Sequence, residues 1–250
     1  MTDAPKLEPL PDEDLRRVLC VVAHPDDLEY GTSAAVAEWT DRGVEVAYLL
    51  LTRGEAGMQI PPEECARIRR GEQERACAEV GVSSLTMLEH PDGMLVYSLE
   101  LRRDIARVIR QFKPDAVVGM GWDIDAPWGL NMADHRVSGL VTVDAIRDAD
   151  NTWVHPELAK SENLPKWGAR WLLIAGHQQP THGIEVSDAA VARAVKSLES
   201  HEEYLAAIPG HPKPADFIPE MLAGGGKALG VDHAVAVKAF DLRGRPAGAE

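Results

Sequence analysis

The alternation of short apolar runs with longer amphipathic segments constrains the fold of this chain more than any other feature. Apolar runs at residues 18–23 (VLCVVA), 44–51 and 116–120 are typical of strands buried on both faces. Between them lie segments with helical periodicity. In residues 98–112, apolar side chains recur at i, i+4, i+7 and i+11. This alternation predicts an α/β fold, with a mainly parallel sheet and helices on both faces.

The same reasoning gives the other expected elements: helices at residues 33–41, 62–80, 133–148 and 187–207, and strands at residues 84–88, 171–175 and 234–240. Beyond residue 208 the pattern is weakest. No change in composition marks a linker, so we expect residues 1–250 to form a single domain. We expect residues 1–14, which are polar and rich in proline and acidic groups, to be a flexible tail.

The charge of the chain excludes some classes of function. A net charge of −14 repels phosphate backbones and anionic membranes, so we expect neither a nucleic-acid nor a membrane partner. No stretch is long and apolar enough to span a bilayer, and the N-terminus lacks the pattern of a signal peptide. Three cysteines without a CxxC pair fit reduced thiols in a cytoplasmic protein. A homo-oligomer is compatible with the sequence.

His24, Asp26 and Asp27 directly follow the first apolar run. Ligands of open α/β sheets bind beyond the carboxyl ends of the strands, so these side chains are candidates for a site. Imidazole and carboxylate are ordinary ligands of zinc or of another borderline divalent ion, and the second carboxylate could act as a base toward water. The alternative is an acidic helix start in which Asp26, Asp27 and Glu29 are capping groups. The chemistry of the run alone leaves both interpretations open.

A catalytic zinc usually has three protein ligands, so the metal interpretation needs one more. His135 follows the expected strand at 116–120 and its loop, and it can face His24 across the same sheet edge. Asp134 beside it could order the loop or a ligand from outside the first coordination sphere. The alternative for His135 is an ordinary surface or capping residue.

With these residues in their order, the sequence resembles the PIG-L/LmbE-like N-deacetylase family. Its hallmark Ala-His-Pro-Asp-Asp run matches residues 23–27, and five further motifs follow in order. They match residues 52–57 (TRGEAG), 69–82 (RRGE, then Ala76 and Val80-Gly81-Val82), 92–93 (DG), 134–139 (DHR, then Gly139) and 197–201 (SLESH).

The resemblance implies a Rossmann-like fold and a zinc site of His24, Asp27 and His135, with Asp26 as the general base. The implied reaction hydrolyses the acetamide of an acetylated amino sugar or of a glycoside carrying one. Arg69 and Asp92 match positions that contact the substrate. To the expected substrate contacts we add three further residues of these post-strand segments: Glu55, Trp128 and His182.

Two positions depart from the family pattern. Met132 occupies the place where a histidine usually assists the oxyanion, and methionine cannot donate a hydrogen bond. Loss of one such donor typically costs about 10²–10³ in rate. His177, His182 and His201 are candidate replacements, each with a structural role as the alternative. Leu28 stands where glutamate is common, and Glu29 could replace its local hydrogen bonding.

Three other functions stay open at this level. One is an amidase that cleaves thiol conjugates of a glucosamine-inositol compound. The second is a metal-binding relative with impaired catalysis, because of Met132. The third is a nucleotide-binding protein with a capped turn at His24, although no G-x-G-x-x-G follows any expected strand.

Overall fold

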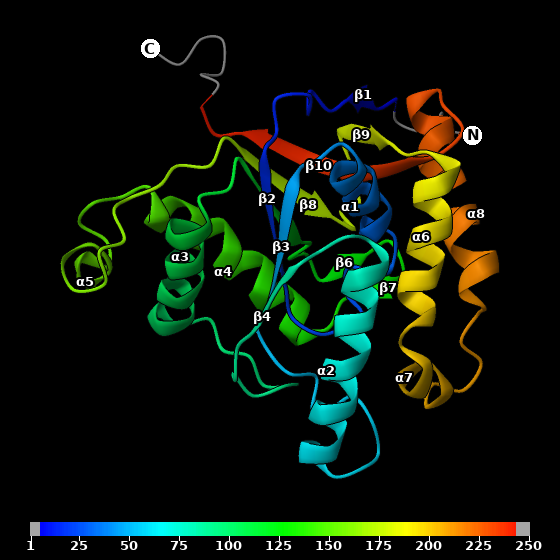
Figure 1. Cartoon of the computed structure of the whole chain (residues 1–250), viewed down its shortest axis with the longest axis horizontal. Coiled ribbons are helices and arrows are strands. Elements are labelled where there is room, and N and C mark those ends of the chain that lie inside the picture. Colours follow the sequence, from blue (N-terminus) through cyan, green and yellow to red (C-terminus); the bar gives the residue numbers. More distant parts are fainter. Residues whose placement is uncertain (1–5, 244–250) are drawn as a thin grey trace.

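The computed structural model describes residues 6–243 and is built on one eight-stranded sheet of order β1-β9-β10-β8-β5-β2-β3-β4 (Figure 1). The strands are β1 (Glu8–Pro9), β2 (Arg17–Val22), β3 (Glu45–Leu50), β4 (Ser84–Met87), β5 (Ala116–Met120), β8 (Trp171–Ala175), β9 (His182–Glu185) and β10 (Ala234–Asp241). All neighbouring strands pair in parallel except β10, which is antiparallel to both β8 and β9. The prediction of a mainly parallel α/β sheet is therefore confirmed.

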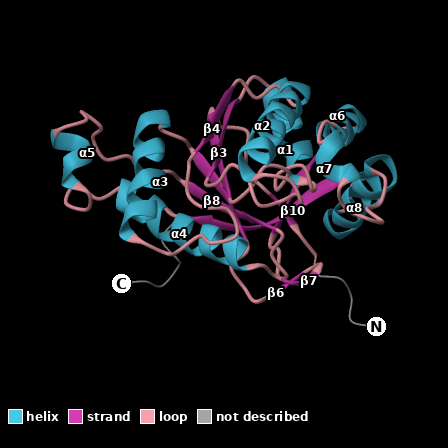
Figure 2. Ribbon diagram, turned by 90° about the horizontal axis from the view of Figure 1, so that it is seen from below, coloured by secondary structure: helices cyan, strands magenta, loops and turns pink. Residues whose placement is uncertain are grey.

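Helices cover both faces of this sheet, as the sequence predicts (Figure 2). The pair α3 and α4 packs on one face, while α1, α2, α6 and α8 form the layer on the other. The helices are α1 (Thr32–Asp41), α2 (Pro62–Glu79), α3 (Leu99–Phe112), α4 (Ala133–Ala149), α5 (Pro156–Lys160), α6 (Asp188–Glu199), α7 (Glu202–Ala206) and α8 (Pro214–Leu229). A small hairpin, β6 (Asp125–Ala126) with β7 (Gly129–Leu130), lies in the loop after β5.

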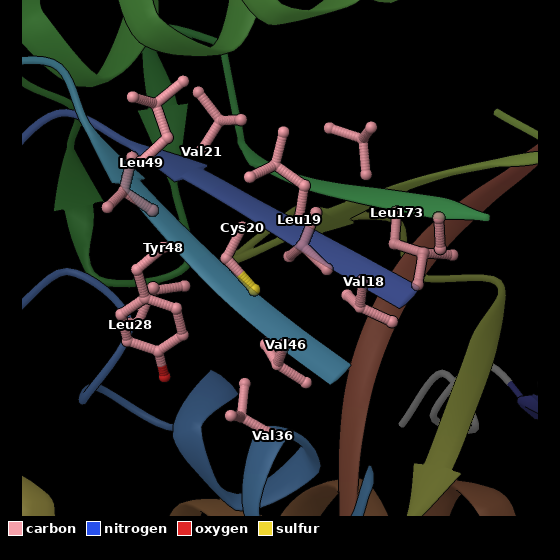
Figure 3. Close-up of a cluster of buried hydrophobic side chains, with 14 of the residues drawn as sticks. Val18, Leu19, Cys20, Val21, Leu28, Val36, Val46, Tyr48, Leu49 and Leu173 are labelled. Atoms are coloured by element: carbon pink, nitrogen blue, oxygen red, sulfur yellow. The ribbon is translucent and has the colours of Figure 1, made fainter. Parts of the chain in front are cut away.

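The core is built from the alternating side chains of the central strands. Cys20 of β2 lies beside Tyr48 of β3 in register, on the side that faces Val36 of α1 (Figure 3). Val21 and Leu49 point to the opposite side of the same two strands. All five side chains are buried, because both faces of the sheet are covered. Burial also raises the pKa of the Cys20 thiol, which makes it an inert core residue.

The structure corrects the expected elements in the last third of the chain. The helix expected at 187–207 is interrupted at Ser200 and His201, where the backbone of His201 leaves the helical region (ψ 49). Residues 182–185, for which the sequence predicts no strand, form β9, and the weakly patterned segment after residue 208 contains α8.

The N-terminal segment is also different from the expectation of a flexible tail at residues 1–14. Residues 1–5 lie outside the described part of the chain. Leu7 and Leu10 are buried, and the backbone of Glu8 and Pro9 pairs with β9. Two buried leucines on a paired strand fix this segment, so the prediction is wrong for it. Within the described residues, no helix is long and apolar enough to cross a membrane.

Candidate active site

A cavity of about 1150 Å³ opens at the carboxyl edge of the parallel strands. The segments that follow β2, β3, β4, β5 and β8 all reach it, because parallel strands end at the same edge of a sheet. Lining residues from these segments include His24, Asp26, Asp27, Ala56, Asp92, Trp128, His135 and His177. The structure thus gathers loops that are about 150 residues apart in the sequence.

His24, Asp27 and His135 meet at this edge. His24 Nδ1 lies 3.6 Å from Asp27 Oδ2, and His135 Nε2 lies 3.0 Å from Asp27 Oδ1. One ligand atom from each residue falls within 4.8 Å of the other two. An imidazole nitrogen and a carboxylate oxygen that face each other need a proton or a cation between them. His135 Nδ1 has no hydrogen-bond partner, and the set of two imidazoles and one carboxylate fits a divalent metal ion with an open position.

The other side of the His24 ring is held by carboxylates. Its Nε2 lies 3.0 Å from Asp92 Oδ1 and 3.2 Å from Asp134 Oδ2. A proton on Nε2 leaves the lone pair of Nδ1 directed toward Asp27, which is how an outer carboxylate fixes the tautomer of a ligating histidine. Burial lowers the pKa of His24, but the surrounding carboxylates outweigh it and raise that pKa well above its ordinary value.

His24, Asp92 and Asp134 form a second cluster that could hold a cation. Two observations favour an orienting role for these carboxylates instead. Asp134 accepts hydrogen bonds from the backbone of Gly93 (2.8 Å) and Leu95 (3.0 Å), and Asp92 accepts one from the backbone of Ala56 (2.7 Å). Three of the four carboxylate oxygens thus accept a backbone N–H, so the cluster connects the turn after β4 to His24.

Asp26 occupies an unusual backbone conformation, with φ of 83°. Non-glycine residues rarely adopt positive φ, and they adopt it where the surroundings enforce it. Here two buried side chains of α2 hold Asp26 in this conformation. Gln73 Oε1 accepts the Asp26 backbone N–H at 3.0 Å, and Arg69 Nη2 donates to Asp26 Oδ1 at 2.6 Å. The Asp26 carboxylate is thereby fixed beside Asp27.

Burial raises the pKa of Asp26 to about 6, even though Arg69 lowers it. For Asp27 burial also opposes ionisation, but His135 and His24 prevail and lower its pKa below the ordinary value. The two adjacent carboxylates therefore have different characters. One is a permanent anion suited to a cation, and the other is a group that can exchange a proton near neutral pH.

The predicted substrate residues separate into two groups. Arg69, Asp92 and Trp128 line the cavity. Glu55 lies behind the lining, where its carboxylate accepts the backbone N–H of Asp92 at 3.1 Å and so supports that turn. His182 is away from the cavity because it belongs to β9, and its ring packs 6.3 Å from the Trp171 ring. The expectation that His182 contacts substrate does not hold in this structure.

The histidines considered as replacements at Met132 also separate. Met132 is 47% exposed on the cavity wall, and His177 lines the same cavity. His201 is fully buried outside it, with its ring nitrogens 3.8 Å from Glu29 and 4.0 Å from Glu72. Burial lowers the pKa of His201 to about 3, so it is a neutral core residue. His177 is therefore the member of the three that can face a substrate.

Several residues of the cavity are not predicted from the sequence. Tyr204 stacks on the guanidinium of Arg69, with Arg69 Cζ 3.8 Å from the ring centre. The Tyr30 hydroxyl bonds His211 Nε2 at 2.8 Å. Tyr204 and His211 come from the region after α6, which carried no motif. Their positions depend on how that region folds back over α2 and α1, which no local pattern reveals.

Comparison with known proteins adds independent information. Residues 19–146 match the PIG-L family model, described as GlcNAc-PI de-N-acetylase. A diacetylchitobiose deacetylase of Thermococcus kodakarensis is 29% identical over 77% of this chain and 71% of its own length. A probable N-acetyl-alpha-D-glucosaminyl L-malate deacetylase of Bacillus anthracis is 32% identical over 52% of this chain and 59% of its own length.

The fold has a close counterpart among solved structures. The N,N'-diacetylchitobiose deacetylase from Pyrococcus horikoshii superposes with a TM-score of 0.81 over 92% of this chain and 86% of that chain, at 24% identity. This likeness establishes the Rossmann-like α/β fold. The family match spans more than half of the chain and includes the His24 run and His135. The predicted resemblance is confirmed: the chain belongs to the PIG-L family of deacetylases, which are amide hydrolases.

Proposed function

We propose that this chain is a metal-dependent deacetylase that removes an acetyl group from a small amino-sugar glycoside, with Zn²⁺ held by His24, Asp27 and His135. The observation that carries the proposal is the meeting of three ligand atoms within 4.8 Å beside the Asp26 carboxylate. The two named relatives, both deacetylases of N-acetylglucosamine compounds, support the substrate class.

The side chains would share the work as follows. Zinc at this position supplies a Lewis acid for the amide carbonyl and acidifies a water molecule. Asp26, with its raised pKa, accepts the proton of the attacking water and returns it to the leaving amine. Arg69 fixes that carboxylate through its 2.6 Å contact and prevents it from turning away.

We also propose that His177 replaces the donor missing at Met132. Its Nδ1 accepts the backbone N–H of Gln179 at 2.9 Å, so the proton of the neutral ring is on Nε2, which lies 3.5 Å from Asp123 Oδ2. A His177→Ala variant should lower kcat about 10²-fold with little change in KM, because an oxyanion donor acts mainly in the transition state. Unchanged kcat would exclude His177 from this role.

The direct test combines metal analysis with acetate release. Purified protein should hold about one zinc per chain. His135→Ala should lose it, because two ligands remain where three bound. Arg136→Ala, the neighbouring change outside the ligand set, is the control and should keep the metal. The proposal fails if the wild-type protein neither contains nor takes up zinc, or if acetate is released from no acetylated glucosamine compound in a broad screen.

The other candidate functions receive less support. The named relatives are deacetylases, so we do not favour an amidase of thiol conjugates. A metal-binding relative without catalysis would bind zinc but release no acetate in the same screen. A nucleotide-binding protein would leave the clustering of His24, Asp27 and His135 without a purpose.

A further inference from the structure

The cavity extends well beyond the metal ligands as an apolar groove. We define the groove by one face of α8 (Phe217, Met221, Gly224, Gly225 and Ala228), the β10 residues Ala234–Ala236, and the turn at Tyr30 and Gly31. Its α8 face has helical spacing, at i, i+4, i+7, i+8 and i+11. The span from residue 217 to residue 228 is about 16 Å at the rise of an α-helix. Figure 1 shows α8 lying beside β10 at this end of the sheet.

Two neighbouring glycines of α8 have opposite surroundings along the groove. A side chain at Gly225 would collide with Ala234 O at 2.2 Å, so α8 packs closely on β10 there. At Gly224, an exposed residue of the cavity lining, a Cβ would meet nothing within 4 Å. The groove continues to the metal residues through two contacts. Met221 lies against Gly31, four residues after Asp27, and the Trp128 ring lies against Gly176 at the end of β8.

The side chains that line the groove determine which kind of ligand it can bind. Among the described residues that line the whole cavity, the carboxylates and the guanidinium are Asp26, Asp27, Asp92 and Arg69, all near His24. The groove itself offers no charged group to a ligand. The Tyr30 hydroxyl and His211 Nε2 bond each other, and the Tyr30 ring packs edge-on against Phe217, 6.2 Å between centres. A carboxylate or a polyol in this groove would lose hydration and gain few partners in return.

We propose that the groove binds the apolar aglycone of the substrate. This inference rests on the proposed deacetylase function and deepens it. The preferred substrate is an N-acetylglucosamine glycoside whose aglycone is a hydrocarbon group, in contrast to the malate or second-sugar moieties in the names of the relatives. The sugar amide lies at His24, Asp27 and His135, and the aglycone lies along α8.

The experiment compares methyl, butyl and octyl glycosides of N-acetylglucosamine by acetate release from the zinc-loaded protein. A fully buried methylene favours binding about fourfold, and an open groove buries part of each, so we expect roughly twofold per methylene. The value of kcat/KM should therefore rise about a hundredfold from methyl to octyl. The gain should appear in KM, because the aglycone is far from the reacting bond.

Gly224→Leu should remove the gain while leaving the methyl glycoside unaffected, because the new side chain fills the groove. Ala223→Leu, which adds the same side chain at an exposed α8 position outside the groove, should retain the gain. The groove proposal is overturned if the methyl glycoside is hydrolysed but kcat/KM does not depend on chain length. It is also overturned if Gly224→Leu leaves the gain from methyl to octyl unchanged. In both cases the deacetylase proposal stands.

Two further measurements keep the outcomes separate. Calorimetric binding of octyl glucosaminide, the deacetylated product, tests the groove without turnover. Binding by the wild type and not by Gly224→Leu supports the groove even if no acetate is released from any compound, which would count against the deacetylase function alone. Light scattering tests whether a second copy of the chain covers the groove. A dimer that Gly224→Leu dissociates would overturn the aglycone proposal.

Discussion

The Asp26 carboxylate is fixed by residues of a different element, and its role can be tested with a single isosteric change. Asp26→Asn keeps the shape of the side chain and cannot accept a proton. We expect kcat to fall about 10²–10⁴-fold, the usual contribution of a positioned general base, with the zinc content unchanged. Asp14→Asn, a change at an exposed residue outside the cavity lining, is the control. Turnover near the wild-type value would remove Asp26 from this role.

His201 gives a pH-dependent test of the buried cluster behind the cavity. Its pKa is about 3 in the folded chain, from 6.5 without burial. Between these values the unfolded state binds a proton that the folded state does not, so stability falls as pH falls. Relative to His201→Gln, the wild type should lose about 2 kcal/mol of unfolding free energy between pH 6.5 and 4.5. Denaturant unfolding at both pH values measures this, and a difference independent of pH would contradict it.

The departure at Leu28 is explained at the same scale. Glu29, the next residue, is fully buried, and its Oε1 accepts the side-chain N–H of Gln73 at 3.0 Å. Gln73 in turn bonds the backbone of Asp26. Burial raises the pKa of Glu29 to about 8. Glu29 therefore takes up the local hydrogen bonding that the sequence suggested, through a residue of α2 that the sequence did not single out.

At the scale of elements, the contact of α8 with β10 depends on glycine spacing. Gly225→Ala forces a methyl group against Ala234 O, and overpacking of this kind typically destabilises by about 1–3 kcal/mol. Gly224→Ala, one residue away, has open space and should stabilise by up to about 1 kcal/mol through helix propensity. Thermal unfolding of both variants checks the prediction. Equal effects would mean that α8 does not lie on β10 in this register.

The role of the motif residues on α2 also depends on where this helix packs. The sequence predicts helix α2 and the family position of Arg69, but Arg69 becomes informative only when α2 lies against the turn after β2. There its Nη2 contacts Pro25 O at 2.5 Å as well as Asp26. The Tyr204 ring from α7 then stacks on the guanidinium. A break at His201 makes that possible, because a continuous helix over 187–207 would carry Tyr204 in a different direction.

At the scale of the whole molecule, the N-terminal segment tests how the edge of the sheet is completed. Deletion of residues 1–10 removes β1 and the buried side chains of Leu7 and Leu10. Burial of each leucine contributes about 1.5–3 kcal/mol, so the deletion should lower the unfolding free energy by about 3–6 kcal/mol. Deletion of residues 1–5 alone retains every described contact of β1 and is the control. Equal stability of the two deletions would restore the flexible-tail interpretation.

The sequence by itself determined the α/β class, most strand and helix positions before residue 180, and the residues that carry the chemistry. It could do so because buried parallel strands are continuously apolar and because polar residues that follow them lie at one sheet edge. Ordered motifs then identified the family. The apolar runs and the polar residues that follow them are local patterns, so each can be recognised in a short stretch of sequence.

The tertiary structure decided everything that depends on which distant segments meet. It excluded His182 and His201 from the cavity, placed Glu55 behind the Asp92 turn, and brought Tyr204 to Arg69. It also formed the apolar groove, whose walls come from α8, β10 and the turn after β2. The physical reason is packing. A glycine can allow a close helix contact or can border an open cavity, and the element opposite to it decides which. Gly224 and Gly225 are neighbours with the same local sequence, yet only Gly225 lies against a strand.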